Sequence, residues 1–349
     1  MNNTKNNEVK KLPSFETFQR VCEFAAIEAA RTIGHGAKEA SDYAAVRAMQ
    51  CMFDELETKA RIVSTEGSLD NSYRFEYGEA VGMYKDREGE ADLDIAIDPL
   101  EGTSLCAKGL PGACAVMAVA DRGALLNAQE MYMWKMVVGP KARHAIDLRR
   151  SYTENILKVA IALEKKPSEL TIAVLGRDRH NDLISEIRST GAMIMQLPAG
   201  DLLPGIATCF PDSGIDMLLG AGGGPEGVIT AAALKCLGGN MQGRLDVALT
   251  EKEMGEKLNF QDVNEDILTI DDLVSGYVHT VIVTAVTNAY WLEGVRYRDQ
   301  HVHTNTLNIR GTHTYQKDVP SARDLSLHHW AQKQLSDEEI SAAIRKYQK

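Results

Sequence analysis

Residues 98–103, Asp98-Pro99-Leu100-Glu101-Gly102-Thr103, combine several groups that can do chemistry. Two carboxylates lie three residues apart at the end of an apolar strand, which the proline is expected to break. Hard divalent cations such as Mg²⁺ and Mn²⁺ prefer oxygen ligands of this kind. The glycine allows a ligand to approach the backbone closely, and the threonine hydroxyl can orient a water beside a metal. An exposed acidic turn is the alternative interpretation.

A second acidic stretch, Thr65-Glu66-Gly67, also follows an expected strand, with Asp70 four residues beyond Glu66. This stretch is a second candidate for a functional acidic site. A solvated acidic turn explains the pattern equally well.

A third stretch, Gly220-Ala221-Gly222-Gly223-Gly224-Pro225-Glu226-Gly227, is expected to form a loop between a strand and a helix. Glycines in such a loop let main-chain N–H groups reach a phosphate, and the helix N-terminus adds a partial positive charge. Glu226 alone would repel a phosphate, so its presence favours a metal ion between them. The Gly-x-Gly-x-x-Gly pattern at 222–227, with Asp246 as a ribose ligand, suggests a dinucleotide-binding enzyme as the alternative.

A fourth stretch, Arg177-Asp178-Arg179-His180, follows the strand that ends at Leu175. Two guanidinium groups and a possible imidazolium at the end of a strand suit a phosphate group. A solvated loop is the alternative.

The composition limits the classes of protein that remain. The chain has 349 residues, 44% of them hydrophobic, and a formal net charge of −11, so it can bury a core but has no general electrostatic reason to bind nucleic acid or an anionic membrane. Its longest apolar run, at 113–120, is too short to cross a bilayer. The six cysteines contain no Cys-x-x-Cys pair and the N-terminus shows no signal peptide, so we expect reduced thiols in the cytoplasm.

Hydrophobic periodicity predicts a mixed α/β fold that positions these groups. In the N-terminal half it predicts two helices, with Ser14 and Ser41 as N-caps and Asp42 in the first turn of the second helix. Strands are expected at 60–65 and at 92–98, the latter with one apolar and one acidic face. A hairpin is expected to join 113–120 to 124–128.

The C-terminal half alternates between expected strands and helices, which is typical of β-α-β units. The strands are expected at 170–175, 193–197 and 215–219, and the helices at 181–190, 202–209 and 227–237. We place a boundary near residue 165, between subdomains at 14–165 and 166–315. Residues 1–13 are expected to be disordered, and the polar tail at 316–349 is expected to end in a helix capped by Ser336 and Glu339.

These residues resemble the class II fructose-1,6-bisphosphatases, within the lithium-sensitive, metal-dependent sugar and inositol phosphatase superfamily. Residues 98–103 are similar to the superfamily signature Asp-Pro-(Ile/Leu)-(Asp/Glu)-Gly-Thr. Similarities more specific to class II lie at 127–133, 138–140 and 223–227. The resemblance covers roughly residues 15–315 and implies a layered α/β/α/β/α fold in two subdomains.

The resemblance also implies an activity, a cofactor and a set of site residues. The activity is removal of the 1-phosphate from fructose 1,6-bisphosphate by a dimer or tetramer with two or more Mg²⁺ or Mn²⁺ ions. The implied metal ligands are Asp42, Glu66, Asp98, Glu101 and Glu226. Asp70 and Thr103 would orient the attacking water, with Asp70 accepting the proton of the threonine hydroxyl. The implied substrate contacts are Glu101, Gly102, Thr103, Tyr132, Arg177, Arg179, Gly200, Asp201 and Gly223.

Three stretches depart from the family pattern on the substrate side. Ser64–Ser68 replaces Gly-Glu-Gly-Glu with loss of one acid, Arg177–His180 replaces Lys-Pro-Arg-His, and Ala199–Asp201 replaces Asp-Gly-Asp. Fructose 1,6-bisphosphate is therefore the default substrate and sedoheptulose 1,7-bisphosphate or another sugar phosphate the alternative. A sugar-phosphate sensor without catalytic activity is a further alternative.

Overall fold

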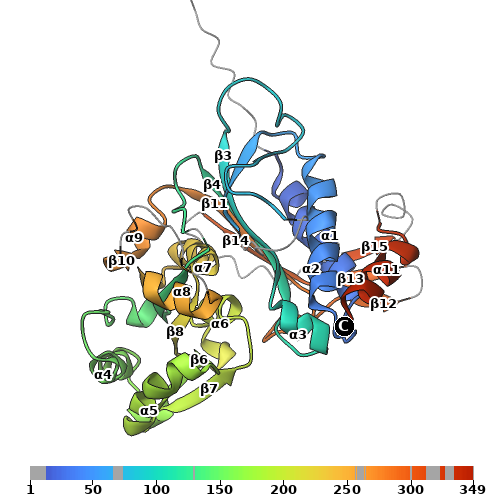
Figure 1. Ribbon diagram of the computed structural model, residues 1–349. Helices are drawn as coiled ribbons and strands as arrows, with labels where there is room; N and C mark the ends of the chain where they lie inside the picture. Colours follow the sequence, from blue (N-terminus) through green and yellow to red (C-terminus); the bar gives the residue numbers. More distant parts are fainter. Residues whose placement is uncertain are drawn as a thin grey trace, which may run out of the picture.

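The computed structural model describes residues 13–65, 74–128, 130–255, 257, 263, 265–298, 301–311, 323–326 and 334–348. Helices and sheets alternate in the order α/β/α/β/α, with one helix layer between two sheets (Figure 1). The mixed α/β fold predicted from the sequence is confirmed.

The first sheet carries the strand that ends in the acidic motif. It has six strands in the order β14-β11-β4-β3-β1-β2. The central strand β3 (Leu93–Glu101) is parallel to β1 (Ala60–Thr65) and antiparallel to β4 (Cys114–Asp121). The other strands are β2 (Ala80–Val81), β11 (Val278–Ala285) and β14 (Thr306–Arg310).

Strand β3 differs from its prediction at its C-terminal end. Pro99 does not end the strand, because a shift of register between Asp98 and Glu101 lets the chain pass the missing proline N–H and continue to Glu101. Every residue of β3 is also buried, so the acidic face predicted for Asp94 and Asp98 lies inside the protein. Helices cover both sides of this central strand, and the buried Asp94 accepts a hydrogen bond from the Gly123 amide at 2.6 Å.

The expected hairpin between 113–120 and 124–128 does not form. Strand β4 pairs with β3 on one side and with β11 on the other, so both of its edges are occupied. Residues 124–128 contribute an isolated bridge between Leu125 and Val274. A partner distant in the sequence therefore replaces the local one, because β11 offers a longer buried strand.

Helices α1 (Phe15–Ala30) and α2 (Lys38–Phe53) cover the outer face of the first sheet. Both helices were predicted, but Ser41 is not the N-cap of the second. Helix α2 begins at Lys38, four residues earlier than a Ser41 cap would give, so Ser41 lies inside the helix and donates a hydrogen bond to the Ala37 carbonyl at 3.2 Å. The short helix α3 (Thr103–Lys108) follows β3 after a single glycine.

The second sheet has six strands in the order β10-β9-β5-β8-β6-β7. The predicted β-α-β pattern is confirmed, because β6 is parallel to both β7 and β8. Helices α4 (Tyr152–Ala162) and α5 (Asn181–Ser189) cover its outer face. The strands are β5 (Tyr132–Val138), β6 (Thr171–Leu175), β7 (Met193–Leu197), β8 (Met217–Gly223), β9 (Asn240–Leu245) and β10 (Leu268–Thr269).

The middle layer is built around α7 (Gly224–Leu237), which Figure 1 shows between the two sheets. Its alanines and leucines pack in one core with Val116 and Val283 of the first sheet and with Val137 of the second. Because both faces of α7 are covered, the two sheets share a single hydrophobic core. Further helices are α6 (Leu202–Ala207), α8 (Val247–Met254) and α9 (Ile270–Leu273).

The C-terminal region adds a small sheet and a helix. The sheet contains β12 (Arg296–Arg298), β13 (His301–Thr304) and β15 (Arg323–Ser326). Helix α11 (Asp337–Tyr347) begins with the predicted capping box between Ser336 and Glu339. Its apolar face packs on the N-terminal half of α2, through Ile340, Ala343 and Ile344 against Ala37, Ala40 and Ala44.

The predicted boundary near residue 165 does not coincide with the division between the sheets. Strand β5 precedes residue 165 but belongs to the second sheet, whereas β11 and β14 follow it and belong to the first. Residues 1–12 of the expected disordered N-terminus lie outside the described residues.

Candidate active site

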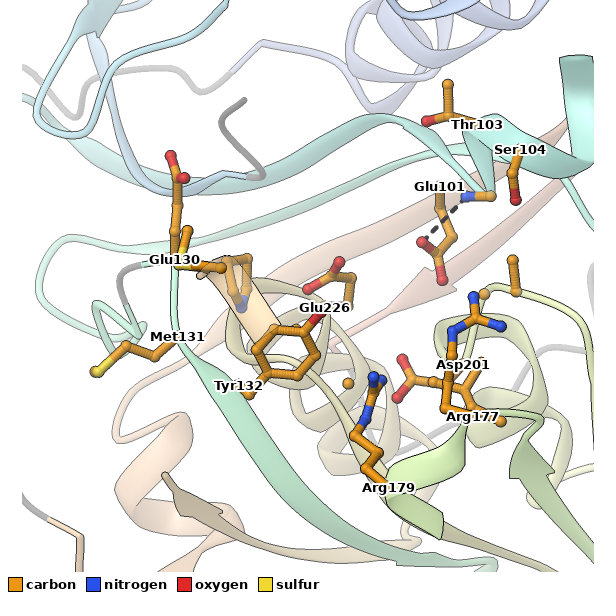
Figure 2. Close-up of a pocket in the computed structure, with 18 of the residues that line it drawn as sticks. Glu101, Thr103, Ser104, Glu130, Met131, Tyr132, Arg177, Arg179, Asp201 and Glu226 are labelled. Carbon is orange, nitrogen blue, oxygen red and sulfur yellow. Dashed lines mark hydrogen bonds between the residues drawn. The ribbon is translucent and has the colours of Figure 1, made fainter. Parts of the chain in front are cut away.

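A pocket of about 410 Å³ lies where the ends of β3, β5, β6 and β8 approach the first turns of α3 and α7 (Figure 2). Residues from both sheets and from the middle layer line it. Every residue predicted to contact the substrate lies in this lining: Glu101, Gly102, Thr103, Tyr132, Arg177, Arg179, Gly200, Asp201 and Gly223. The lining also includes Lys38 and Glu130, which the sequence did not indicate.

Three carboxylates form a buried cluster at this pocket. Oxygens of Asp98, Glu101 and Glu226 lie within 4.8 Å of one another, and the three residues are 1%, 5% and 8% exposed. Asp98 and Glu101 come from the irregular end of β3, and Glu226 comes from the first turn of α7. Figure 2 shows Glu101 and Glu226 pointing into the same space. Three of the predicted metal ligands are therefore brought together.

The chemistry of this cluster fits a hard divalent cation. Glu101 accepts a hydrogen bond from the Leu202 amide at 3.2 Å, but Glu226 Oε2 is buried without a hydrogen-bond partner among the described residues. Burial and the nearby Glu226 and Asp201 raise the pKa of Glu101 to about 7, and burial also raises the pKa of Glu226. Buried carboxylates that repel one another are stabilised as anions by a bound cation.

The other predicted acids are not part of this cluster. Asp42 lies on α2, half-buried, and does not belong to the acidic group found among the described residues. Burial, with a smaller effect from Glu39, raises the pKa of Asp42 to about 6. Glu66 and Asp70 lie outside the described residues.

Thr103 begins α3 at the edge of the pocket. Gly102 precedes it with φ = 76°, a left-handed conformation that glycine adopts without strain. The Thr103 hydroxyl donates to the Leu100 carbonyl at 3.0 Å. Its oxygen can therefore still accept a hydrogen bond from a water.

Two arginines supply positive charge to the same pocket, as Figure 2 shows. Arg177 donates to the Pro198 carbonyl at 2.9 Å. Arg179 donates to the Ala221 carbonyl at 2.9 Å, pairs with Glu253 at 2.7 Å and lies 4.7 Å above the centre of the Tyr132 ring. These contacts hold the guanidinium groups in place, so the pocket presents cations beside the acidic cluster.

The expectation that His180 could bind phosphate as an imidazolium is wrong. His180 is fully buried, and its Nδ1 donates to the Leu175 carbonyl at 2.7 Å. Its Nε2 lies 2.7 Å from the Ala221 amide nitrogen and accepts that hydrogen bond, which requires the neutral ring. Burial lowers the pKa of His180 in agreement with this geometry. The ring links the end of β6 to β8.

The expected glycine loop is absent, because β8 runs to Gly223 and α7 begins at the next residue. The glycines instead leave room for side chains of the site. A Cβ at Gly222 would lie 2.2 Å from Asp201 Oδ2, and a Cβ at Gly223 would lie 2.0 Å from Glu226 Oε2. This arrangement removes the structural basis of the dinucleotide hypothesis. Asp246, the proposed ribose ligand, caps α8 and accepts a hydrogen bond from the Trp134 indole at 2.9 Å.

Lys135 is a residue of the site region that the sequence analysis missed. It is 2% exposed in the middle of β5, and its Nζ lies 2.8 Å from Asp201 Oδ2. The run Tyr132–Val138 contains one charged residue among apolar and aromatic ones. A lysine at the centre of an otherwise apolar strand indicates a functional or paired charge, because a buried charge requires a partner.

Oxygen ligands for a divalent cation next to arginines for phosphate fit a metal-dependent phosphoric monoester hydrolase. The family model described as bacterial fructose-1,6-bisphosphatase, glpX-encoded, matches residues 14–322. The chain therefore belongs to this family, and the resemblance seen in its motifs is confirmed.

Individual relatives agree with the family match. The chain is 38% identical over 307 residues to fructose-1,6-bisphosphatase 1 class 2 of Escherichia coli K12, covering 84% of this chain and 90% of the relative. The class 2 enzyme of Shigella flexneri gives the same identity and coverage. The D-fructose 1,6-bisphosphatase class 2/sedoheptulose 1,7-bisphosphatase of Thermosynechococcus vestitus is 36% identical over 310 residues, covering 83% of this chain and 89% of the relative.

The raised pKa of Glu101 predicts how pH affects the stability of the metal-free protein. The pKa of Glu101 is about 7 in the folded state and its ordinary value is 4.5. Between pH 4.5 and pH 7, folding is therefore accompanied by protonation of this carboxylate. The contribution of Glu101 protonation to the free energy of unfolding is fully present below pH 4.5 and is lost as the pH rises through 7. Thermal unfolding of chelator-treated protein should show a midpoint that falls over this range, and Glu101→Gln should flatten the profile. An equally steep profile in the variant would contradict the assignment.

Proposed function

We propose that the protein hydrolyses fructose 1,6-bisphosphate to fructose 6-phosphate and phosphate, with Mg²⁺ or Mn²⁺ as cofactor. The observation that carries the proposal is a pocket in which three carboxylates lie within 4.8 Å of one another beside Arg177 and Arg179. Membership of the bacterial fructose-1,6-bisphosphatase family supports the choice of substrate.

Some of the site residues would bind metal ions, and others would orient the attacking water. Asp98, Glu101 and Glu226 would hold a divalent ion, and the family resemblance adds Asp42 and Glu66 as further metal ligands. When bound, such ions neutralise phosphate charge, lower the pKa of a water and stabilise the leaving alkoxide. Thr103 would accept a hydrogen bond from the attacking water, and Asp70 would complete its orientation.

The substrate would be held by groups on the other walls of the pocket. Arg177 and Arg179 would bind the phosphates, and the Tyr132 ring keeps the second guanidinium in place. Asp201, following Gly200, would accept hydrogen bonds from sugar hydroxyls. The main-chain N–H groups of residues 101–103 and of Gly223 would bind phosphate oxygens. A backbone donor needs no side chain in the pocket for this contact.

Sedoheptulose 1,7-bisphosphate is the second candidate substrate. Ala199 lines the pocket where the family pattern has an acid, so the wall beside Asp201 loses one hydroxyl contact and gains space. A sugar with one more carbon could use that space. The Thermosynechococcus relative carries both activities in its name.

We also propose that the enzyme acts in the cytoplasm as a homo-oligomer. All six cysteines are free thiols, which agrees with a reducing compartment. Over the described residues, every helix is too short or too polar to span a lipid bilayer.

A phosphate-release screen over sugar mono- and bisphosphates tests the proposal. The purified protein is stripped with a chelator and assayed without metal, with Mn²⁺ and with Mg²⁺. Fructose 1,6-bisphosphate should release one equivalent of phosphate only when metal is present, and the corresponding monophosphates should release little. Binding of the bisphosphate without phosphate release under any metal would instead show a sensor. Preference for sedoheptulose 1,7-bisphosphate would reassign the substrate within the same reaction class.

A further inference from the structure

Lys135 is a buried lysine, 2% exposed, next to the pocket. It lies in the central strand β5, on the side that faces the middle helix layer, between the core residues Met133 and Val137. The residue paired with it is glycine on both neighbouring strands, Gly220 on β8 and Gly243 on β9. No side chain therefore stands beside the lysine at this register.

The ammonium group of Lys135 has one acidic partner that reaches the pocket. Its Nζ lies 2.9 Å from Asp201 Oδ1 and 2.8 Å from Oδ2, so both carboxylate oxygens are engaged. Asp201 is 7% exposed and lines the pocket, whereas Lys135 lies behind it. Gly222 also packs against this carboxylate, where a Cβ would come within 2.2 Å of Oδ2. The ion pair and this close backbone contact together fix the orientation of Asp201.

The same ammonium group acts on the whole acidic region. Asp98, Glu101, Asp201 and Glu226 are all buried there, and Lys135 is paired with one of them, Asp201. Its charge opposes the rise in pKa of both Glu101 and Glu226. Lysine therefore offsets part of the negative charge that a divalent ion would otherwise meet.

We propose, resting on the function proposed above, that Lys135 is a positioning residue for this reaction. It holds the Asp201 carboxylate toward the sugar hydroxyls and places an ammonium group behind the metal site. Removing that charge has two effects of opposite direction. Substrate binding weakens because Asp201 loses its orientation, and divalent cations bind more tightly because the site becomes more negative.

The experiment compares Lys135→Met, which keeps an unbranched side chain one atom shorter and removes the charge, with wild type. The KM for fructose 1,6-bisphosphate should rise by about 10- to 100-fold, as when a partner of a ligand-binding group is removed. Calorimetric titration of the metal-free variant with Mn²⁺ should show a Kd lowered by about threefold or more. Lys141→Met, an exposed lysine three residues beyond β5, is the matched control and should change neither value.

A double-mutant cycle tests whether Lys135 acts through Asp201. In the Asp201→Asn background, Lys135→Met should change the KM by less than about threefold, because the group that the lysine positions is already gone. The double variant removes both members of the Lys135–Asp201 pair, so neither is left as a charge without its partner. It therefore keeps the test available where Lys135→Met alone does not fold.

The outcomes separate positioning from structural support. Weaker Mn²⁺ binding together with a higher KM in a folded variant would overturn the proposal, as would an undiminished effect on KM in the Asp201→Asn background. If the wild type releases no phosphate, the proposed function fails. Mn²⁺ titration and calorimetric binding of fructose 1,6-bisphosphate still test the role of Lys135 in that case.

Discussion

Asp98→Asn and Glu226→Gln are each expected to lower phosphate release from fructose 1,6-bisphosphate by about 1,000-fold or more. Each change keeps the size of the side chain but replaces a buried anionic oxygen with an amide. The cluster of Asp98, Glu101 and Glu226 then has one carboxylate fewer for a divalent ion. Metal assistance contributes several kcal/mol to such reactions, and about 4 kcal/mol corresponds to a 1,000-fold change in rate.

The measurement is kcat at saturating Mn²⁺, together with Mn²⁺ titration of the metal-free variants. Asp94→Asn is the matched control, because Asp94 is buried on the same strand but lies outside the pocket. That variant should lose stability with the loss of its contacts to Arg61 and Gly123, yet keep kcat within a few-fold. Near-normal turnover in Asp98→Asn or Glu226→Gln would show that the metal assignment is wrong.

Gly223→Ala is expected to reduce kcat by about 100-fold or more while the protein stays folded. The added Cβ would lie 2.0 Å from Glu226 Oε2, so the carboxylate must leave its position in the cluster. A displacement of about 1 Å in a reacting group can cost about 100-fold in rate. The substitution thus tests the position of Glu226 without changing any ligand.

Gly243→Ala provides the control for inserting a methyl group into the same sheet. Its Cβ would lie 2.7 Å from Met133 Sδ, the end of a flexible side chain that is no part of the pocket lining. We expect a loss of stability of about 1–3 kcal/mol and a kcat within about tenfold of wild type. Equal losses of activity in the two variants would mean that general strain in the sheet, rather than Glu226, explains the effect.

Much of the fold follows from patterns that are local in the sequence. Strand β1 was predicted at its observed bounds, and the β-α-β units were found because strand and helix periods alternate clearly there. The hairpin after β4 was wrong because β11, more than 150 residues away in sequence, pairs with β4 instead. Strand β5 was missed because Lys135 interrupts its apolar pattern.

The site was predictable where its residues belong to short motifs. Asp98, Glu101 and Glu226 were placed together by motif resemblance, and the structure brings them together. The partners of Lys135 and Gly222 could not be predicted, because they depend on the register of β5 with β8 and on the path of the chain around Asp201. The register between two strands and the packing of residues distant in the sequence cannot be predicted from a short sequence motif.

Because of the position of α7, the proposed metal ion would also affect the stability of the layered fold. Asp98 and Glu101 belong to the first sheet, while Glu226 stands at the start of the helix that packs on both sheets. A cation bound by all three carboxylates would connect the first sheet to the middle helix layer, as a cross-link that forms only in the folded state would. Metal binding would then raise the free energy of opening between the layers. Loss of metal would loosen the interior of the enzyme as well as stop its chemistry.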